Sequence, residues 1–577
     1  MKKGFIRIIC KVIVVFMLTT LVLSGCGAQE NSNQTGTPTA EGTKEVTTTD
    51  TATSSEDTSS ADELEWKSDT SPFSFRQFFY GTWATMYVWK DQYAMKLATE
   101  KTGVTIDRFL ATGNDDDYLN TMIAADDLPD SLMLEWNKPT VSKLIKSGMV
   151  LSLTDLINQY CPKFNDILDE EMVKYHSVDG ELWYLPTMYT TIDGMKNGLP
   201  TITVRPWFIR KDIYEALGKP KMETPDDYIA AMKLAKQQYP DISALGLEKF
   251  DVNTEGLKGS RSMDWLIYSF APNLEKERIN DQNQTYEYPM RNEGFREAFR
   301  FLNRLNREGL FDPNLLIYKQ EQYEEKLYGA NYFVASQYTS DMYGKFNPKI
   351  EATLGNDKTY ISLDGLKVNG QDPKYPSSRN MGWQGFFITK NAKNPERIIK
   401  FAEYAWSDEG QMDFRYGKEG ETYDMKDGLP VLKPEITELR YSDSAGFDAK
   451  YGFEESHLLW RSGELWDKAG QITFKEQQPE QYATLMNLSK YNEDIFSLGI
   501  DNVEPDGTSS EGVINAKVKD IWNKTIPKLA LAKSDAEFDS VYSDFISQID
   551  KVGAEKAEKA MYLRHVDDMK KKSGSGN

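Results

Sequence analysis

The sequence predicts an α/β protein of two or more domains, built from mostly parallel sheets flanked by helices. Predicted strands and helices alternate from Phe73 onward, which is the pattern of βαβ units. About 500 residues separate Glu63 from Val566, too many for one compact hydrophobic core. After Pro430 the predicted segments are mostly helical, and no new strand-rich unit follows.

The alternation is clearest before residue 136. The predicted elements are a strand at Phe73–Tyr80, a helix at Thr85–Thr102, a strand at Val104–Leu110, a short helix through Met122 and a strand at Ser131–Glu135. Gly103 follows the first helix directly, and glycine commonly ends a helix because it adopts positive φ without strain. Strands joined through helices at this spacing predict parallel pairing.

The same pattern resumes further along the chain. The predicted elements are a strand at Thr201–Arg210, a helix from Thr224 to about Gln238, a helix at Asn292–Glu308, strands at Tyr332–Ser336 and Phe386–Thr389, and a helix from Asn394 to about Ser407. The start of the Thr224 helix is the best defined, because an N-cap threonine is followed by a first-turn proline and two acids.

The N-terminus has the features of a lipoprotein signal peptide. A basic start precedes the apolar run Val12–Leu23, which is shorter than the roughly 20 residues of a membrane-spanning helix. The segment Leu23-Ser24-Gly25-Cys26 resembles the lipobox of bacterial lipoproteins, whose cysteine is diacylated. We therefore expect a signal peptide at residues 1–25 and a lipid on Cys26. The alternative is a plain secretory signal with a chance cysteine.

Residues 26–65 are expected to hold the lipidated cysteine and a disordered tether. The stretch from Gly27 to about Asp62 is rich in Thr and Ser, lacks aromatic residues and has Val46 as its only large aliphatic residue. Such a segment cannot bury enough apolar surface to offset the entropy of ordering it. The predicted location is the extracellular face of the cell membrane, held there by the lipid alone.

Net charge and cysteine content argue against two classes of protein, nucleic-acid-binding proteins and disulfide-rich scaffolds. Loss of the signal peptide removes four positive charges and changes the net charge from −21 to −25, which argues against a nucleic-acid partner. Cys10 leaves with the signal and Cys26 is lipidated, so Cys161 remains alone and a disulfide scaffold is excluded. We expect Cys161 to be a small buried residue.

Several stretches, taken in order, resemble the extracellular solute-binding proteins of ABC importers. The family is solute-binding protein family 1 of the maltose-binding-like superfamily, in its larger Gram-positive complex-saccharide type. The stretches are Met122–Asp130, Val150–Ile157, Asp179–Pro186, Trp207–Asp212 before Leu217-Gly218, Arg307–Pro313, Gly385–Lys390 and Asn394–Lys400. Each pattern is loose alone, but their order together with the lipobox makes the resemblance specific. It covers roughly residues 75–430.

The resemblance implies a two-lobed, type II periplasmic-binding-protein-like fold with a hinge and an interlobe cleft. The implied organisation is lobe 1 at residues 66–190 and 383–430, lobe 2 at 191–382 including the hinge crossings, and a C-terminal helical part at 431–577 that packs mainly on lobe 2. The crossings are expected near Tyr189–Leu199 and Asn369–Gly382.

The implied function is the capture of an oligosaccharide, or another carbohydrate, in the cleft and its delivery to a membrane permease. The expected partners are the sugar and the transmembrane subunits of an ABC permease. We expect a monomer without a cofactor and without catalytic activity. Neither the identity, length and linkage of the sugar nor the permease is specified by these residues.

A sugar ring has apolar C–H faces and a rim of hydroxyls, so its site needs aromatic rings with polar groups beside them. Ligands of parallel sheets bind beyond the carboxyl ends of the strands, where several such residues are predicted. The candidate ligand-binding residues are Trp83, Trp136 and Trp383, followed by Tyr80, Asn114, Asp115, Glu135, Trp207, Trp265 and Tyr338. Trp183 and Trp406 are expected to be core residues, the alternative role for any tryptophan.

Enzymatic function finds little support. The three histidines lack metal-ligand spacing, and the nucleophile-elbow, Walker A and dinucleotide-binding motifs are absent from the sequence. Abundant carboxylates leave open a surface-tethered glycan hydrolase or lyase as the alternative function. Asp115-Asp116-Asp117 is open to two interpretations, a calcium site or, more simply, a solvated loop or a helix N-cap.

Overall fold

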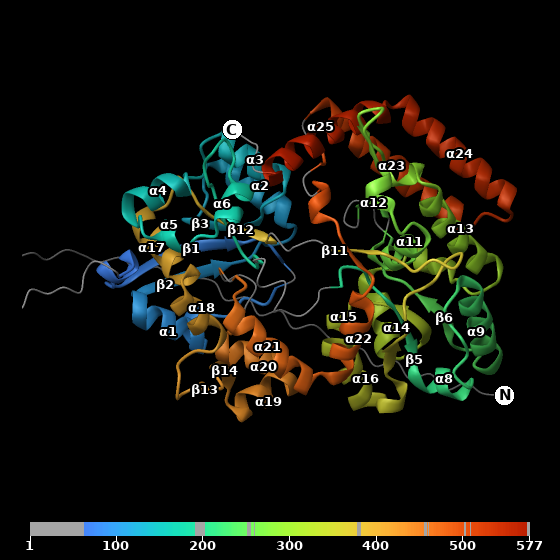
Figure 1. Cartoon of the computed structure of the whole chain (residues 1–577), viewed down its shortest axis with the longest axis horizontal. Coiled ribbons are helices and arrows are strands. Elements are labelled where there is room, and N and C mark those ends of the chain that lie inside the picture. Colours follow the sequence, from blue (N-terminus) through green and yellow to red (C-terminus); the bar gives the residue numbers. More distant parts are fainter. Residues whose placement is uncertain are drawn as a thin grey trace, which may run out of the picture. The chain divides into compact units, whose positions relative to one another are not determined.

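The computed structural model describes most of the chain after the predicted tether (Figure 1). The described residues are 63–82, 84–190, 202–250, 256–258, 260–377, 382–454, 459, 461–500, 503–507 and 509–573. The predicted signal peptide, the lipobox cysteine Cys26 and the candidate ligand residue Trp83 lie outside them, as does most of the first predicted hinge crossing. Within these ranges, no helix has the length and apolarity needed to span a bilayer.

The first sheet has five strands in the order β2-β1-β3-β12-β4. Its strands are β1 (Phe73–Phe79), β2 (Val104–Phe109), β3 (Ser131–Glu135), β4 (Leu185–Pro186) and β12 (Gln384–Ile388). The predicted parallel pairing holds for β1 with β2 and β3, but β12 runs antiparallel to β3 and β4. Gln384 pairs with Glu135, so β12 enters the sheet at the edge where β3 ends and must run the opposite way. The sheet is therefore mixed rather than mostly parallel.

Both faces of the first sheet are covered. Phe79, Met133 and Phe386 contribute to a buried cluster on one face, which we call the first core. Their chain neighbours Phe78 and Leu132 contribute to a separate cluster on the opposite face. This alternation follows from the two-residue period of a strand. The sheet is buried on both sides, as its continuous apolar runs require.

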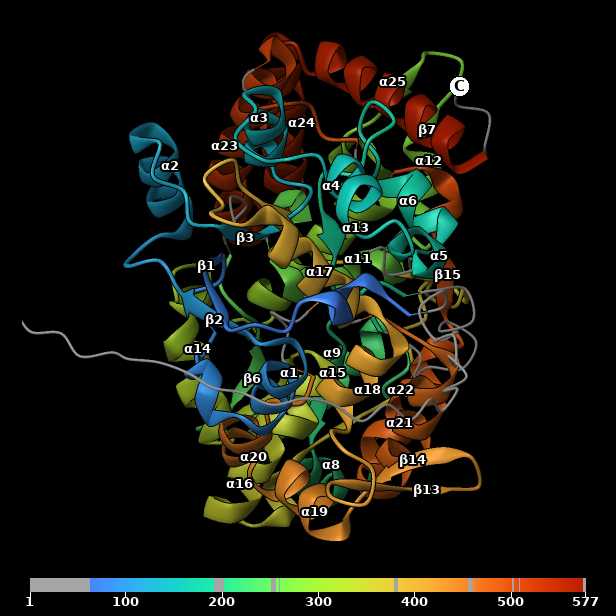
Figure 2. The same ribbon diagram turned by 90° about the vertical axis from the view of Figure 1, so that its left-hand side faces the viewer.

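Helices cover both faces (Figure 2). The helices that contribute to the first core are α1 (Tyr93–Thr102), α4 (Leu153–Tyr160), α5 (Phe164–Ile167), α6 (Glu170–His176), α17 (Pro395–Trp406) and α18 (Asp408–Arg415). Those on the opposite face are α2 (Asp115–Ala125) and α3 (Pro139–Lys146). Helix α1 ends at Gly103, whose φ of 72° lets its N–H bond the Thr99 carbonyl. That terminus confirms the sequence prediction.

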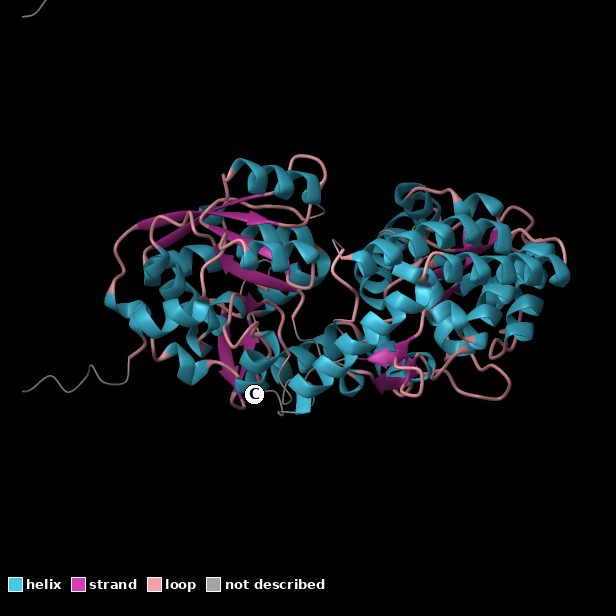
Figure 3. Cartoon of the chain, turned by 90° about the horizontal axis from the view of Figure 1, so that it is seen from above, coloured by secondary structure: helices cyan, strands magenta, loops and turns pink. Residues whose placement is uncertain are grey.

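The second sheet has four strands in the order β10-β5-β9-β6, and Figure 3 shows the strands in two groups, each surrounded by helices. Its strands are β5 (Trp207–Arg210), β6 (Ser243–Gly246), β9 (Tyr332–Ser336) and β10 (Tyr360–Ser362). Only β6 and β9 pair in parallel, so this sheet is also mixed. The predicted strand Thr201–Arg210 is shorter than expected, because β5 begins at Trp207.

A second buried cluster, the second core, lies on one face of this sheet. The helices around the sheet are α8 (Lys211–Ala216), α9 (Pro225–Gln238), α11 (Asp264–Phe270), α12 (Leu274–Glu277), α13 (Glu293–Arg307), α14 (Gln320–Tyr328), α15 (Thr339–Asp341) and α16 (Asn347–Leu354). Helix α9 starts with the predicted cap, a reciprocal capping box between Thr224 and Asp227.

The C-terminal part divides between the two cores rather than packing on one. Its helices are α19 (Pro434–Ser442), α20 (Ser444–Tyr451), α21 (Glu464–Gln477), α22 (Pro479–Ser489), α23 (Ser510–Ala530), α24 (Asp535–Lys551) and α25 (Ala554–Ser573). Buried residues from Leu432 to Ala469 belong to the first core, and those from Leu485 to Met561 belong to the second. Trp522 of α23 contacts Phe299 of α13, with ring centroids 5.0 Å apart.

In the described part of the chain, six short strands lie outside the two sheets and form three pairs. Two of the pairs are the hairpins β7 (Ile279–Asn280) with β8 (Thr285–Tyr286) and β13 (Tyr423–Lys426) with β14 (Leu429–Leu432). In addition, β11 (Tyr375–Ser377) pairs in parallel with β15 (Asn492–Asp494). This last pair joins the C-terminal part to the segment that precedes β12.

Candidate functional site

The carboxyl ends of β1 and β3 bring three of the predicted residues to one edge of the first sheet. Tyr80 directly follows β1, and its N–H bonds the Met133 carbonyl of β3 at 2.9 Å. Glu135 ends β3 and Trp136 follows it. Because neighbouring parallel strands end at the same edge, the sequence prediction that placed these residues together is physically sound. We call this set the first edge.

Lys138 organises the first edge, although the sequence did not single it out. Its ammonium donates to the Tyr80 hydroxyl and lies 4.3 Å from the centre of that ring. It also lies 3.7 Å from the Glu135 carboxylate and 3.5 Å from that of Asp116. Burial first, and Asp116 second, raise the pKa of Tyr80, so its hydroxyl stays protonated. A cation three residues after the strand-ending Glu135 was the available sequence signal.

Asn114 and Asp115 have structural contacts at the first edge. Asn114 is the N-cap of α2, and its side-chain oxygen accepts from the Asp117 N–H at 3.1 Å. Asp115 accepts from the backbone N–H groups of Gly81 and Thr82 at 3.2 and 3.0 Å, which holds the loop after β1. Asn114 is therefore the N-cap, and Asp115, Asp116 and Asp117 lie in the first turn of α2. Over the described part of the chain, no group of three or more ligating side chains is placed to bind a metal.

Trp136 and Trp383 lie on either side of the junction between β3 and β12. The indole N–H of Trp136 donates to the Gly382 carbonyl at 2.8 Å. Gly382 has a φ of 97°, and a side chain there would meet the Pro186 side chain. Trp383 is half-buried, with its ring edge-on to Phe79 at 6.5 Å between centroids. Each indole thus keeps an exposed part, which a sugar-stacking residue needs.

The second sheet has a comparable edge, formed by Arg205, Glu248 and Tyr338. Glu248 lies two residues beyond β6 and Tyr338 lies two beyond β9, and these two strands are parallel. Arg205 pairs with Glu248, and its guanidinium lies 4.0 Å from the centre of the Tyr338 ring. Sequence reasoning found Tyr338 but missed the other two, because Arg205 fell inside the overlong strand prediction. We call this set the second edge.

Trp207 and Trp265 are core residues, contrary to the sequence prediction that they bind ligand. Each is only 1% exposed, and their rings stack with centroids 5.3 Å apart. Trp207 is the first residue of β5 and Trp265 lies in α11, so both rings meet inside the second core. A ligand at the surface therefore has no access to either ring. Of the two predicted core tryptophans, Trp406 is fully buried, whereas Trp183 is only partly buried.

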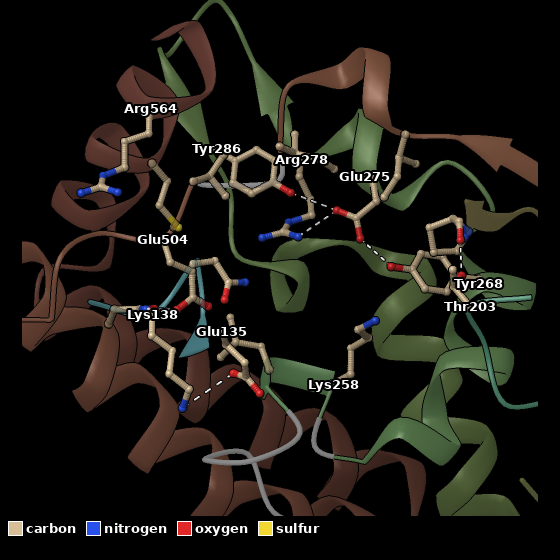
Figure 4. A pocket seen from close by; sticks show the side chains of 18 residues that line it. Glu135, Lys138, Thr203, Lys258, Tyr268, Glu275, Arg278, Tyr286, Glu504 and Arg564 are labelled. Carbon is tan, nitrogen blue, oxygen red and sulfur yellow. Dashed lines mark hydrogen bonds and ion pairs between the residues drawn. The ribbon is translucent and has the colours of Figure 1, made fainter. Parts of the chain in front are cut away.

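A pocket of about 720 Å³ connects the first edge with residues around the second core (Figure 4). Glu135 and Lys138 line it from the first edge. Its other charged and aromatic lining residues are Lys258, Tyr268, Glu275, Arg278, Tyr286, Glu504 and Arg564. The volume lies in the range typical of small-molecule sites, about 300–1,000 Å³. Sequence reasoning missed these seven residues, because no local motif marks them.

A smaller pocket of about 340 Å³ adjoins the first and shares Lys138 and Arg564 with it. Trp136 lines this pocket together with Tyr175, His176 and Tyr184. The Trp136 ring is edge-on to His176 at 5.0 Å and stacked on Tyr184 at 6.4 Å. The two pockets together offer a charged, hydrogen-bonding region beside an aromatic one.

Comparison with known proteins relates this arrangement to transporter components. No protein-family model matches the chain. It is 23% identical over 318 residues to the fructooligosaccharide ABC transporter substrate-binding protein FusA of Streptococcus pneumoniae serotype 4, over 53% of this chain and 56% of that protein. It is 23% identical over 330 residues to the lipoprotein LipO of Bacillus subtilis strain 168, over 54% of this chain and 60% of LipO. These matches therefore span little more than half of the relatives' length.

Among solved structures, the chain resembles an HMO-binding, ABC-transporter-associated solute-binding protein from Bifidobacterium longum infantis. The TM-score is 0.64 at 15% identity, over 86% of this chain and 99% of that one. The chain has a type II solute-binding-protein fold. The type II fold that the sequence motifs implied is thereby confirmed, and the two mixed sheets with their flanking helices are the α/β units of that fold.

Proposed function

We propose that this chain is the substrate-binding component of an ABC importer, which captures an oligosaccharide and delivers it to a membrane permease. A lipid on Cys26 would hold it on the extracellular face of the cell membrane, with residues 27–62 as the tether. It would act as a monomer, without catalysis and without a cofactor.

One observation carries this proposal: the likeness to a solute-binding protein extends over 86% of the chain. The names of the relatives add the ligand class, since FusA is a fructooligosaccharide-binding protein and the Bifidobacterium protein is HMO-binding. Partly exposed aromatic rings beside charged groups, at Tyr80, Trp136 and Tyr338, support a sugar as the ligand. LipO, a lipoprotein, supports the anchor.

We further propose that the two sheets form the two lobes. Lobe 1 would contain residues 66–190 and 383–430, joined by the part of the C-terminal region that packs in the first core. Lobe 2 would contain residues 191–382, including the hinge crossings, together with the later C-terminal helices. Closure on ligand would bring the first and second edges onto the same molecule. Small-angle scattering tests this: a saturating glycan should lower the radius of gyration, whereas a rigid surface site would leave it unchanged.

The central experiment is a thermal-shift screen of the purified protein against a glycan library. A ligand at 100 times its dissociation constant should add about 2.7 kcal/mol of stability. Uptake of the same glycan by the producing cells should disappear when the protein is deleted. A library that produces no shift at all would contradict sugar binding.

The alternative function is a surface-tethered glycan hydrolase or lyase. An enzyme would cleave the glycan, whereas a binding protein releases its ligand unchanged. Incubation of the protein with each glycan that binds, followed by mass spectrometry, separates the two functions. Shortened or unsaturated products would replace the proposed function with an enzymatic one.

A further inference from the structure

The 720 Å³ pocket presents an arginine whose hydrogen-bonding capacity is only partly used. Arg278 donates from Nε to the Glu287 carbonyl at 2.8 Å and from Nη1 to Glu275 at 2.9 Å. Its guanidinium also lies 4.1 Å from the centre of the Tyr286 ring, which fixes its plane. No hydrogen bond joins its Nη2 to any residue that the structure describes. Figure 4 shows that nitrogen pointing into the pocket.

Glu275 holds Arg278 in place and itself accepts three hydrogen bonds. Its two carboxylate oxygens accept from the Tyr268 and Tyr286 hydroxyls at 2.6 and 2.9 Å, in addition to Arg278. Burial alone would raise the pKa of Glu275, but Arg278 and these hydroxyls outweigh it and hold the pKa below its ordinary value. The carboxylate therefore stays ionised, and most of its capacity to accept from a sugar hydroxyl is already used.

The other two carboxylates of the pocket also have cationic partners. Glu135 lies 3.7 Å from Lys138, and Glu504 lies 3.0 Å from Lys519, a residue outside the pocket lining. Among the cations, Lys258 pairs with Asp264 at 3.1 Å. Arg564, exposed at the rim, has no ion-pair partner among the described residues. The lining therefore carries more cations than carboxylates, with Lys138, Lys258, Arg278 and Arg564 against Glu135, Glu275 and Glu504.

This imbalance bears on the chemical class of the ligand. A neutral sugar presents hydroxyls that donate as well as accept, so its site normally supplies open carboxylate or amide acceptors. A carboxylate accepts only, and the flat guanidinium of arginine matches its geometry. An arginine that has an unused Nη2 and is fixed by a carboxylate and an aromatic ring is pre-organised for such a group.

We infer that the ligand of this pocket carries a carboxylate, as in a uronate-containing oligosaccharide, and that Arg278 binds that group. The inference rests on the proposed function and specifies its substrate class. Lys258 and Arg564 add positive potential on either side. Trp136 and the adjoining aromatic pocket receive a neighbouring sugar ring.

The test compares each ligand with its own neutral form. Galacturonate, mannuronate and glucuronate oligosaccharides are titrated by calorimetry beside the same oligosaccharides after reduction of the carboxyl to a primary alcohol. The wild-type protein should prefer at least one uronate over its reduced form by about tenfold to a hundredfold, the range for a hydrogen bond to a charged group. R278K keeps the positive charge beside Glu275 but loses the planar guanidinium with its paired N–H donors. It should lower this preference about tenfold. K559Q, on α25 outside the pocket, should leave it unchanged.

The outcomes distinguish a failure of the carboxylate site from a failure of the proposed oligosaccharide binding. Reduced oligosaccharides that bind as tightly as their uronates, or a preference that R278K does not alter, would overturn the carboxylate site while leaving sugar binding intact. Failure of every oligosaccharide in both forms would contradict the proposed function, and this inference with it. The wild-type comparison decides the matter even if R278K does not fold.

Discussion

The indole N–H of Trp136 donates to the backbone carbonyl of Gly382 at 2.8 Å, joining two residues 246 positions apart in the chain. This bond ties the end of β3 to the start of β12, the strand that brings the chain back into the first sheet. The ring that makes it also lines the aromatic pocket. One residue therefore contributes both to the sheet junction and to the candidate site.

Replacing Trp136 with phenylalanine should lower the free energy of unfolding by about 1 kcal/mol, because it deletes this hydrogen bond and keeps an aromatic ring. Urea denaturation measures the change. Trp183→Phe is the matched control, since that indole donates over 3.3 Å to Val178, only five residues away. Equal effects of the two substitutions would show that the long-range bond adds nothing.

Lys138→Gln should weaken glycan binding about tenfold and change stability by less than about 1 kcal/mol. The lysine is partly exposed, so its ion pairs contribute little to folding, yet it positions the Tyr80 ring and the Glu135 carboxylate. Calorimetric titration and a melting curve on one preparation give both numbers. Lys143→Gln, at an exposed position of α3, the helix that follows Lys138, is the control and should alter neither. Unchanged affinity in Lys138→Gln would remove Lys138 from the site.

Trp383→Ala distinguishes a sugar-binding ring from a structural one. The residue is half-buried, so we expect a loss of glycan binding of on the order of 1–3 kcal/mol with a smaller change in apo stability. Trp406→Ala is the comparison, because that ring is fully buried and its loss should cost about 3–5 kcal/mol of folding stability. A large fall in melting temperature for Trp383→Ala, with unchanged affinity, would make Trp383 a core residue.

Glu403 should make the stability of the protein depend on pH. Burial, followed by the neighbouring Glu65 carboxyl, raises the pKa of Glu403 to about 8 from an ordinary value of 4.5. The folded state therefore keeps a proton that the unfolded state has already lost. The stability this provides is complete below about pH 4.5 and is lost as the pH rises through about 8.

Unfolding free energies measured by urea between pH 5 and pH 8 should therefore fall by at most about 1.4 kcal/mol per pH unit on account of this group. Glu403→Gln should remove that part of the slope, because an amide does not titrate. The backbone N–H of Trp66 donates to Glu403 at 2.6 Å, and the amide oxygen of glutamine can still accept this bond. Glu396→Gln, a partly exposed position on the same helix, should keep the wild-type slope. Parallel pH profiles for the two variants would refute the assignment.

Cys26→Ser should abolish lipidation while leaving the described elements intact, because residues 63–573, which contain them, lie beyond the proposed tether. The variant should be shed into the medium or retained through its uncleaved signal peptide, as fractionation of cells would show. Globomycin, which blocks the lipoprotein signal peptidase, should likewise alter detergent partitioning of the wild type. Unchanged partitioning after globomycin would contradict the lipobox.

Local signals in the sequence determined much of the fold. The bounds of β3 and β9, the Thr224 cap and the Gly103 terminus follow from alternation and capping, which act over a few residues. The gathering of Tyr80, Glu135 and Trp136 at one edge was predictable, because neighbouring parallel strands end at the same edge of a sheet. Those inferences needed only neighbours in the chain and the rule for parallel sheets.

The tertiary structure decided what depends on long-range pairing. The antiparallel entry of β12 follows from where the returning chain meets β3, and local sequence does not carry that information. Trp207 and Trp265 were wrongly expected at the surface, because a tryptophan has the same local signature whether its ring turns inward or outward. Lys138, Arg205 and Arg278 were recognised as candidate site residues only from their contacts in the tertiary structure. Charged residues are abundant in this chain, and the free energy that fixes one of them comes from groups far away in the sequence.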